Sequence, residues 1–223
     1  MPTCSICGNS EFRAGPNNRL SSEGLPPVCT KCGSLERQRI GRELIESIRE
    51  RQKFQNYRMI MFSKDCTVPM GWFKSGEISV YDHQNSLDVQ NIDRPDGSYD
   101  FIICSHVIEH VADPRRAIKE LTRILSEEGL ILLAYPLPVR CEKTRDWGYP
   151  DWSNHGHYRV FGRDFETEYA TIIPQATVIG SRGIDSVTHD EDLVYFITKN
   201  SYWVQRILSS GEKTYVVSGQ KQR

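Results

Sequence analysis

Short apolar runs rich in Ile, Phe, Val and Leu recur along the middle of the chain, each bounded by turn or polar residues. This pattern is typical of strands buried on both faces of a parallel sheet. Between two of the runs, apolar residues repeat at helical spacing over 114–127, and Gly129 ends the repeat, which predicts a helix. In chain order, the predicted strands are 57–62, 77–82, a short strand or extended piece at 87–92, 99–104, 130–135, 176–180 and 193–198.

The alternation of strands and helices predicts an α/β sheet with right-handed crossovers and a ligand crevice at the carboxyl ends of its strands. A last helix is expected at 161–173, followed by two strands that form a hairpin at the edge of the sheet and make one strand antiparallel. The polar cluster within 104–110 directly follows a predicted central strand. It is therefore expected at the ligand-binding edge.

Residues 137–160 show no periodicity, and irregular segments of this length are often lids or substrate-binding loops. Two histidines in the segment, His155 and His157, are candidates for contact with a substrate. The aromatic residues Trp147, Trp152 and Tyr158 offer a wall for a sugar or a base, or else anchor the loop.

Two copies of one motif lie near the N-terminus, Cys4-Ser-Ile-Cys7-Gly8 and Cys29-Thr-Lys-Cys32-Gly33. In each copy two thiolates converge in a tight turn, and the glycine supplies the positive φ that the turn needs. Four cysteines predict a closed, structural Zn²⁺ site in a zinc ribbon. The alternative is a redox pair or unliganded thiols, but a redox pair would be expected beside a βαβ unit.

The chain is thus divided into a ribbon at 1–33, a connecting amphipathic helix at 34–53, a main domain at 54–208 and a polar tail at 209–223. The connecting helix carries several arginines interleaved with glutamates. We interpret this as a solvated face with ion pairs, and a phosphate-binding patch is the alternative.

Composition narrows the class of protein. The net charge of -1 does not favour a dedicated nucleic-acid binder, although a local basic face remains compatible with it. No apolar run approaches the length of a membrane span, and the N-terminus does not have the pattern of a secretory signal. Seven cysteines, four of them in C-x2-C pairs, suit metal binding in a reducing compartment, so a cytoplasmic location is expected.

Three stretches resemble the class I S-adenosylmethionine-dependent methyltransferases. The first runs from Asp88 through Asp100-Phe-Ile-Ile, and the second from His106-Val-Ile-Glu-His110 to the helix that ends at Gly129. The third resembles a subgroup that also carries Cys-x-x-Cys-Gly-Ser-x-Glu-Arg, and it comprises Cys29–Arg37, Lys143-Thr-Arg-Asp, His155-Gly-His-Tyr-Arg159 and Phe161-Gly-Arg-Asp164-Phe165. The resemblance implies a Rossmann-like fold and S-adenosylmethionine as cofactor.

An acid at the end of the second predicted strand, Asp82, is placed to accept hydrogen bonds from both ribose hydroxyls. The resemblance assigns the adenine to Asp88 and the Val89 backbone N–H, with Asp93 as the competing acid. It also implies that Asp100, Ser105 and His106 lie under the methionine part of the cofactor.

The family's glycine-rich turn after the first strand is missing from this sequence. The stretch Phe62-Ser63-Lys-Asp65 is similar to the segment that replaces those glycines in the subgroup with the cysteine motif. Asp65 would then face the amino group of the cofactor's methionine. The alternative is a degenerate methyltransferase fold that serves as a scaffold.

Methyl transfer to an O or N atom needs an aligned acceptor and a base, and His106, His110, His155 and His157 are the candidates. The charge favours a small molecule, saccharide or peptide as acceptor, and an RNA-modifying enzyme is a third hypothesis. The ribbon either recognises a macromolecular partner or braces the N-terminus.

Overall fold

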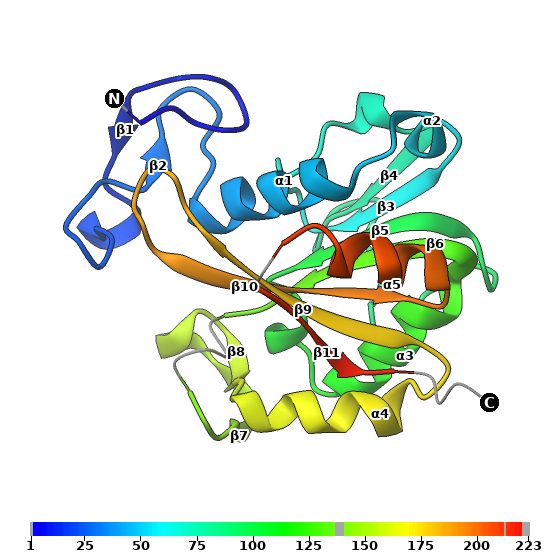
Figure 1. Ribbon diagram of the computed structural model, residues 1–223. Coiled ribbons are helices and arrows are strands. Elements are labelled where there is room, and N and C mark those ends of the chain that lie inside the picture. Colours follow the sequence, from blue (N-terminus) through cyan, green and yellow to red (C-terminus); the bar gives the residue numbers. More distant parts are fainter. Residues whose placement is uncertain (1, 137–140, 212, 220–223) are drawn as a thin grey trace.

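In the computed structural model, which describes residues 2–136, 141–211 and 213–219, seven strands form one sheet in the order β11-β9-β10-β6-β5-β3-β4 (Figure 1). Neighbours among β3, β4, β5 and β6 are parallel, whereas β10 runs antiparallel to β6 and β9, and β11 antiparallel to β9. The strands are β3 (Arg58–Phe62), β4 (Ser75–Ser79), β5 (Tyr99–Ser105), β6 (Leu125–Ala134), β9 (Thr177–Ile184), β10 (Glu191–Thr198) and β11 (Thr214–Ser218).

Helices cover both faces of the sheet, with α1 and α5 above it and α3 and α4 below it in Figure 1. Successive residues of β5 point to opposite sides, so that Phe101 packs among residues of the upper helices and Ile102 among those of the lower ones. The helical segments are α1 (Glu36–Ile48), α2 (Arg51–Phe54), α3 (Pro114–Ile124), η6 (Arg163–Glu168), α4 (Tyr169–Ile172) and α5 (Ser201–Leu208).

Helix α3 begins where the sequence places a start signal. The Asp113 carboxylate accepts a hydrogen bond from the Arg116 backbone N–H at 3.0 Å, and Pro114 occupies the first turn. Both features stabilise a helix N-terminus, and α3 in turn fixes the polar residues that connect it to β5.

The predicted α/β sheet, mostly parallel and with an antiparallel hairpin formed by its last predicted strands, is confirmed. The expected short strand at 87–92 is wrong, because the sheet ends at β4 and this segment is irregular. Its apolar residues Val89 and Ile92 are buried against the core without strand pairing. Burial, and not hydrogen bonding, explains the apolar pattern there.

Three other differences concern the C-terminal part of the chain. The pair β9–β10 is not at the edge, because β11 pairs with β9 inside the stretch expected to be a polar tail. Residues 212 and 220–223 of that stretch lie outside the described residues. The helix expected at 161–173 is divided into the 3₁₀ segment η6 and the short α4, and α5 was not predicted.

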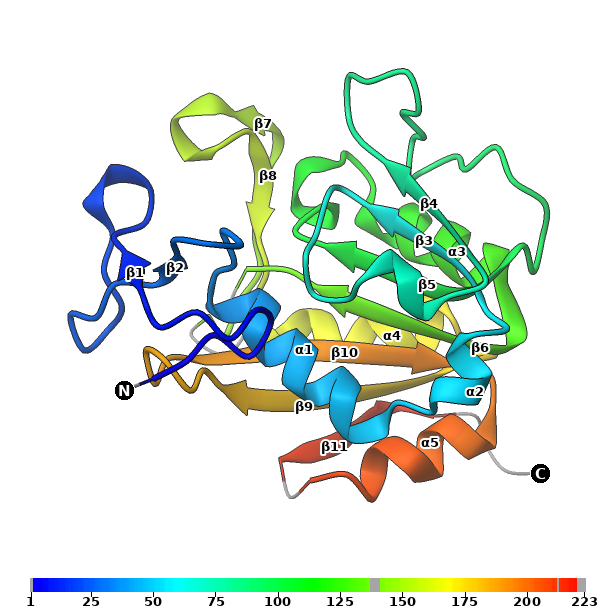
Figure 2. The same ribbon diagram turned by 90° about the horizontal axis from the view of Figure 1, so that it is seen from above.

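The segment expected to be an irregular loop contains a hairpin formed by β7 (Arg145–Asp151) and β8 (His157–Val160), joined by the short turn η5 (Trp152–Asn154). Residues 137–140 of the predicted loop lie outside the described residues. Figure 2 shows the hairpin and the N-terminal module near the end of the sheet at which β5 and β6 finish.

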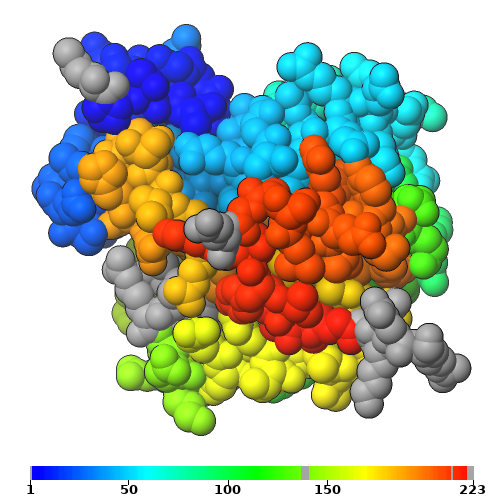
Figure 3. Space-filling model, viewed as in Figure 1, coloured from blue at the N-terminus to red at the C-terminus, as the bar shows by residue number. Residues whose placement is uncertain are grey.

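The N-terminal module contains a two-stranded sheet of β1 (Phe12–Arg13) and β2 (Val28–Cys29) together with the 3₁₀ turn η1 (Pro16–Asn18). It packs against the turn between β9 and β10, as the space-filling view shows (Figure 3). The Arg39 guanidinium and the Asp185 carboxylate form two hydrogen bonds of 2.7 Å there, and both side chains are fully buried. This ion pair links α1 to the sheet directly beside the module.

In the described part of the chain, no helix combines the length and the apolar character that a membrane crossing requires.

Candidate active site and metal centre

Three neighbouring strands end in left-handed backbone at residues other than glycine. Ser63 follows β3 directly with φ of 70°, Asp82 lies just beyond β4 with φ of 58°, and His106 follows β5 with φ of 54°. Such a conformation costs a residue with a Cβ about 1–2 kcal/mol, so it persists where the surroundings impose it, and it clusters at functional sites. The turn after β3 therefore adopts a left-handed conformation without the glycines that the sequence lacks.

The turn after β3 is also held from outside. The Ser63 N–H donates to the Ser79 carbonyl at 2.8 Å, and the Arg42 guanidinium of α1 donates to the Thr67 carbonyl. The Asp65 carboxylate accepts from the Thr67 N–H at 2.6 Å, which closes a local turn. Because the Phe62 side chain is buried in the core, Phe62 can reach a ligand only with its backbone.

The acids predicted to contact the cofactor differ in their surroundings. Asp82 is exposed, and no donor among the described residues pairs with its carboxylate. Asp88 is exposed as well, and it accepts hydrogen bonds from the backbone and side chain of Gln90 at 2.9 and 3.2 Å. The Gln90 side chain in turn accepts from the Asp113 N–H, so Asp88 lies near the end of β5.

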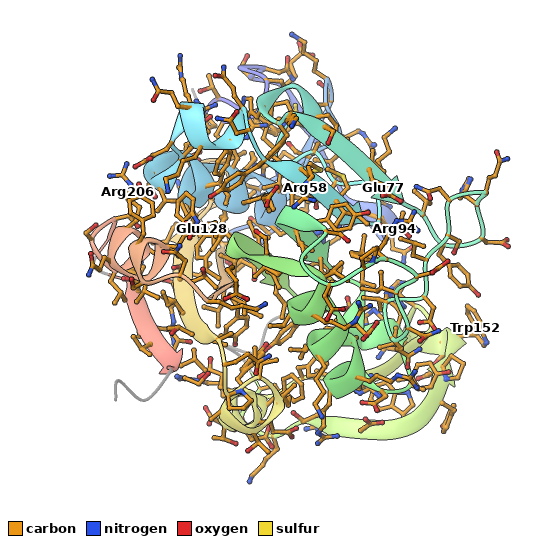
Figure 4. The ribbon with its side chains drawn as sticks, turned by 90° about the vertical axis from the view of Figure 1, so that its right-hand side faces the viewer. Arg58, Glu77, Arg94, Glu128, Trp152 and Arg206 are labelled. Atoms are coloured by element: carbon orange, nitrogen blue, oxygen red, sulfur yellow. The ribbon has the colours of Figure 1, made fainter. Side chains whose placement is uncertain are left out.

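The competing acid Asp93 lies toward the other end of the sheet. The next residue, Arg94, forms an ion pair with Glu77 of β4 and donates to the Tyr99 hydroxyl at the start of β5 (Figure 4). This geometry favours Asp88 over Asp93 for contact with the adenine.

Asp100 does not lie where the family resemblance implies. It is the second residue of β5, and its carboxylate accepts hydrogen bonds from the Arg58 backbone N–H at 2.9 Å and from the Arg58 guanidinium at 3.0 Å. Burial raises the pKa of Asp100, but these hydrogen bonds outweigh burial and hold the pKa below its usual value. Since β5 runs from Tyr99 to Ser105, Asp100 lies at the opposite end of the strand from the predicted site. Its role is structural, because it links β5 to Arg58 of β3.

Three of the four histidines predicted as candidate bases lie around Glu109, and the fourth, His155, lies beside His157. The His106 Nδ1 and His110 Nε2 atoms lie 3.4 and 3.9 Å from one Glu109 oxygen. The His110 and His157 rings meet edge to face with centroids 4.6 Å apart, and the His155 ring centroid is 6.0 Å from that of His157. Burial lowers the pKa of His157, which favours its neutral, proton-accepting form.

Arg159 holds the hairpin against the turn that follows β5. Its guanidinium is buried and donates to the carbonyls of Val111 and Ala112 at 2.5 and 2.8 Å, and to the Asp146 carboxylate at 2.7 Å. The planar fork of arginine suits several acceptors at once. The contact brings His157 of β8 to His110 of the short turn η3 (Ile108–His110).

Sequence reasoning missed Asp192, which is the second residue of β10. Burial raises the pKa of its carboxyl group, and nearby positive charge at His106 and Arg37 partly opposes this rise. The charge interaction places Asp192 near the His106 side chain, which follows the end of β5. The sequence could have indicated this residue, because the last predicted strand, β10, is antiparallel. An antiparallel strand starts at the edge of the sheet where its parallel neighbours end, so its first residues lie near the predicted site.

The four N-terminal cysteines converge as predicted. Their sulfur atoms all lie within 4.8 Å of one another, with Cys4 and Cys32 3.7 Å apart and Cys7 and Cys29 3.5 Å apart. Zn–S bonds of about 2.3 Å in a tetrahedron place sulfur atoms roughly 3.8 Å apart, so the set fits zinc. The Ser34 hydroxyl lies 3.3 Å from Cys4 and 3.2 Å from Cys32, as an outer partner of ligated thiolates would.

The glycine that follows each cysteine pair has the expected conformation. Gly8 has φ of 72° and Gly33 has φ of 73°, and each donates its N–H to the carbonyl of the first cysteine of its pair. Both turns are therefore the tight thiolate turns that the C-x2-C-G motif predicts.

A family model described as a methyltransferase domain matches residues 38–167, more than half of the chain. The chain belongs to this family of methyltransferase domains. It is an S-adenosylmethionine-dependent methyltransferase.

Solved structures of similar proteins are distant in sequence. An S-adenosylmethionine-dependent methyltransferase from Thermotoga maritima is 15% identical with a TM-score of 0.40, and the match covers 73% of this chain and 89% of that one. A Haloferax volcanii methyltransferase in complex with the activator Trm112 is 11% identical with a TM-score of 0.47, covering 73% and 90%. No curated protein matches the chain, so the assignment rests on the family model.

Proposed function

We propose that S-adenosylmethionine lies along the carboxyl ends of β3, β4 and β5. In this proposal Asp82 binds the ribose hydroxyls, and Asp88 and the Val89 backbone bind the adenine. The turn at 62–65, including Ser63 and Asp65, and the segment Ser105–His106 border the methionine part. The proposal rests on the left-handed backbone at Ser63, Asp82 and His106, which follow the ends of the three strands. It also rests on the Asp82 carboxylate, which has no partner among the described residues.

The chemistry that the cofactor supplies is transfer of its methyl group by in-line displacement, and the protein must align the acceptor and remove its proton. The imidazoles of His106, His110, His155 and His157 meet at the same edge as the proposed methionine site. We infer that one of them accepts the proton of an O–H or N–H acceptor.

A small molecule, saccharide or peptide is the proposed class of acceptor. Exposed aromatic side chains support it. Trp152, at the outer end of the hairpin (Figure 4), is 82% exposed, and Tyr149 of β7 is 61% exposed. Tyr81, next to Asp82, is 91% exposed. Aromatic surfaces of this kind bind the apolar faces of ligands, whereas the near-neutral net charge provides little attraction for a polyanion.

The arginines of α1 give no support to an RNA acceptor. Arg39 is buried against Asp185, Arg42 donates to backbone carbonyls, and the Arg49 guanidinium lies over the Trp72 ring, 3.9 Å from its centroid. Since these three side chains bind within the chain, they do not form a free phosphate-binding patch. Arg49 also forms an ion pair with Glu46 at 3.1 Å, as the interleaved pattern predicts. We therefore do not propose RNA as the acceptor.

We further propose that the four cysteines bind one structural zinc ion. The four thiolates fill a tetrahedral coordination sphere, so the site has no open position for catalysis. The contacts of the ribbon with α1 and with the β9–β10 turn support a bracing role within the chain. Recognition of a partner protein through the ribbon stays a prediction.

A transfer assay tests the proposed acceptor class. The purified protein is incubated with methyl-labelled S-adenosylmethionine and with panels of small hydroxyl and amine compounds, saccharides, peptides and total RNA. We expect label in one of the first three panels, and expect it to fall at least about tenfold when Trp152 is replaced by alanine, because aromatic contacts bind the acceptor. Transfer into RNA alone would contradict the proposed acceptor class.

A further inference from the structure

Glu109 is fully buried, and neither of its carboxylate oxygens has a hydrogen-bond partner among the described residues. Buried polar groups are almost always paired, and an unpaired buried carboxylate is strongly unfavourable. An orphaned group of this kind requires an explanation such as a bound ion. The surroundings of Glu109 supply the other ligands that an ion would need.

Glu109, His110 and His157 form a group of ligand atoms. One carboxylate oxygen and one ring nitrogen from each histidine all lie within 4.8 Å of one another. The first two residues belong to η3, directly after the central strand, and His157 comes from β8 of the hairpin. Two imidazoles and one carboxylate are a common set of protein ligands for divalent transition metals.

A hydrogen bond to a neighbouring histidine does not satisfy Glu109. His106 Nδ1 is 3.4 Å from the nearer Glu109 oxygen, but no hydrogen bond forms, and the contact leaves the second oxygen without any donor. Charging both His110 and His157 would place two cations in rings whose centroids are 4.6 Å apart. A single metal ion neutralises the carboxylate and binds both imidazoles in their neutral form.

We propose that Glu109, His110 and His157 bind a divalent transition-metal ion, in a site separate from the four cysteines. The ligand set of two nitrogens and one oxygen suits Zn²⁺, Fe²⁺ or Mn²⁺, and three protein ligands leave positions open for water or for an oxygen of a ligand. Zinc in the cysteine site is held by four thiolates, so the two sites differ in ligand chemistry.

The surrounding structure orients this triad. Arg159 neighbours the triad and donates to the Ile108 and Val111 carbonyls on either side of Glu109 and His110. The metal would therefore fix the hairpin beside the end of β5. A role of the open positions in binding an acceptor oxygen rests on the proposed function, whereas metal binding itself does not.

Titration with Co²⁺ tests the site in the full-length protein after its cysteine site has been loaded with zinc. Calorimetry gives the stoichiometry, and near-ultraviolet and visible absorption identifies the ligands, because cobalt on thiolates shows a charge-transfer band that cobalt on nitrogen and oxygen does not. We expect one equivalent of Co²⁺ without a thiolate band. The variants Glu109→Gln and His157→Asn should each weaken this binding at least about tenfold, since even outer partners of a metal site are worth 10–100-fold.

The matched control is His189→Asn, which removes an exposed histidine paired only with Glu23 and should leave Co²⁺ binding unchanged. If Glu109→Gln does not fold, His157→Asn decides the question by the same criterion, because His157 is only half-buried on the hairpin. Absence of Co²⁺ binding in the zinc-loaded wild type, or wild-type affinity in a folded triad variant, would overturn the proposal. Because the readout is metal binding, failure of the proposed methyl transfer would leave the result intact.

Discussion

Arg39 and Asp185 form a fully buried ion pair on which the junction between ribbon and sheet depends. Asp185 also accepts hydrogen bonds from the Thr188 N–H at 2.9 Å and the Thr188 hydroxyl at 2.8 Å, and Arg39 donates to the Pro27 and Ser34 carbonyls. Each nitrogen of the guanidinium and both oxygens of the carboxylate thereby form at least one hydrogen bond. Removing one partner would leave the other as an uncompensated buried charge.

We expect Asp185→Asn to lower the free energy of unfolding by about 3–5 kcal/mol, the range for breaking one side of a buried pair. Urea denaturation followed by circular dichroism measures it. The control is Glu191→Gln, which breaks an ion pair with Lys213 in which both side chains are about half exposed. Such exposed pairs contribute about 0–1 kcal/mol. If both substitutions lowered the free energy of unfolding equally, the buried pair would contribute no more stability than the exposed one.

The candidate site residues that the sequence singles out are those whose chemistry is encoded locally. The cysteine pairs are defined by spacing, and Asp82 by its place after a strand. Glu109 and Asp192 were not assigned roles, because their burial comes from elements distant in the chain. Asp100 was misplaced because the resemblance identifies the motif but does not show at which end of the strand each of its residues lies.

The β7–β8 hairpin depends on one side chain for its position. Arg159 connects β8 to three backbone carbonyls of the turn that follows β5. The close approach of Gly162 to Lys143 completes the attachment, because a Cβ at Gly162 would lie 2.4 Å from the Lys143 carbonyl carbon. These contacts explain physically why the motifs at 143–146 and 159–165 occur together.

Replacing Arg159 by Met should release the hairpin while keeping most of the apolar packing of the side chain. We expect faster amide hydrogen exchange across 145–160 and a loss of stability of about 2 kcal/mol or more, because charged hydrogen bonds are each worth about 1.5–3 kcal/mol. Exchange read out by mass spectrometry localises the effect. Arg145→Met, on the same hairpin but exposed, should leave exchange unchanged. Equal exchange in the two variants would contradict the role of Arg159 in holding the hairpin.

Zinc removal should act on the ribbon more than on the sheet. A module of this size gains on the order of 10 kcal/mol of folding free energy from a structural zinc ion. After chelation, or in Cys29→Ser, we expect protease cleavage within residues 2–33 while the sheet stays resistant. Cys141→Ser, which changes a thiol outside the cluster, is the control. A ribbon that resists protease equally well without metal would contradict a zinc-dependent fold.

Most of the central sheet could be predicted because its strands are continuous apolar runs. β11, α5 and the β7–β8 hairpin were missed because their sequences carry no strong period. β11 contains Thr214 and Ser218 and is not fully buried at any position, so edge pairing with β9 decides its conformation. The strand predicted at 87–92 is wrong for the opposite reason: its apolar pattern is clear, but these residues fill the core without joining the sheet.

At the scale of the whole molecule, the ribbon and the hairpin are attached at the end of the sheet where the proposed cofactor site lies. The family model establishes the methyltransferase domain, and the central claim is that the cofactor binds along the ends of β3, β4 and β5 with Asp82 on its ribose.

Calorimetric titration with S-adenosylhomocysteine tests this claim most directly, using the zinc-loaded wild type, Asp82→Ala and the control Asp93→Ala. We predict saturable binding by the wild type, unchanged binding by Asp93→Ala, and affinity at least about tenfold weaker for Asp82→Ala, because charge-assisted hydrogen bonds of about 1.5–3 kcal/mol are lost. No binding by the wild type at millimolar ligand, or equal affinity of Asp82→Ala and the wild type, would contradict it.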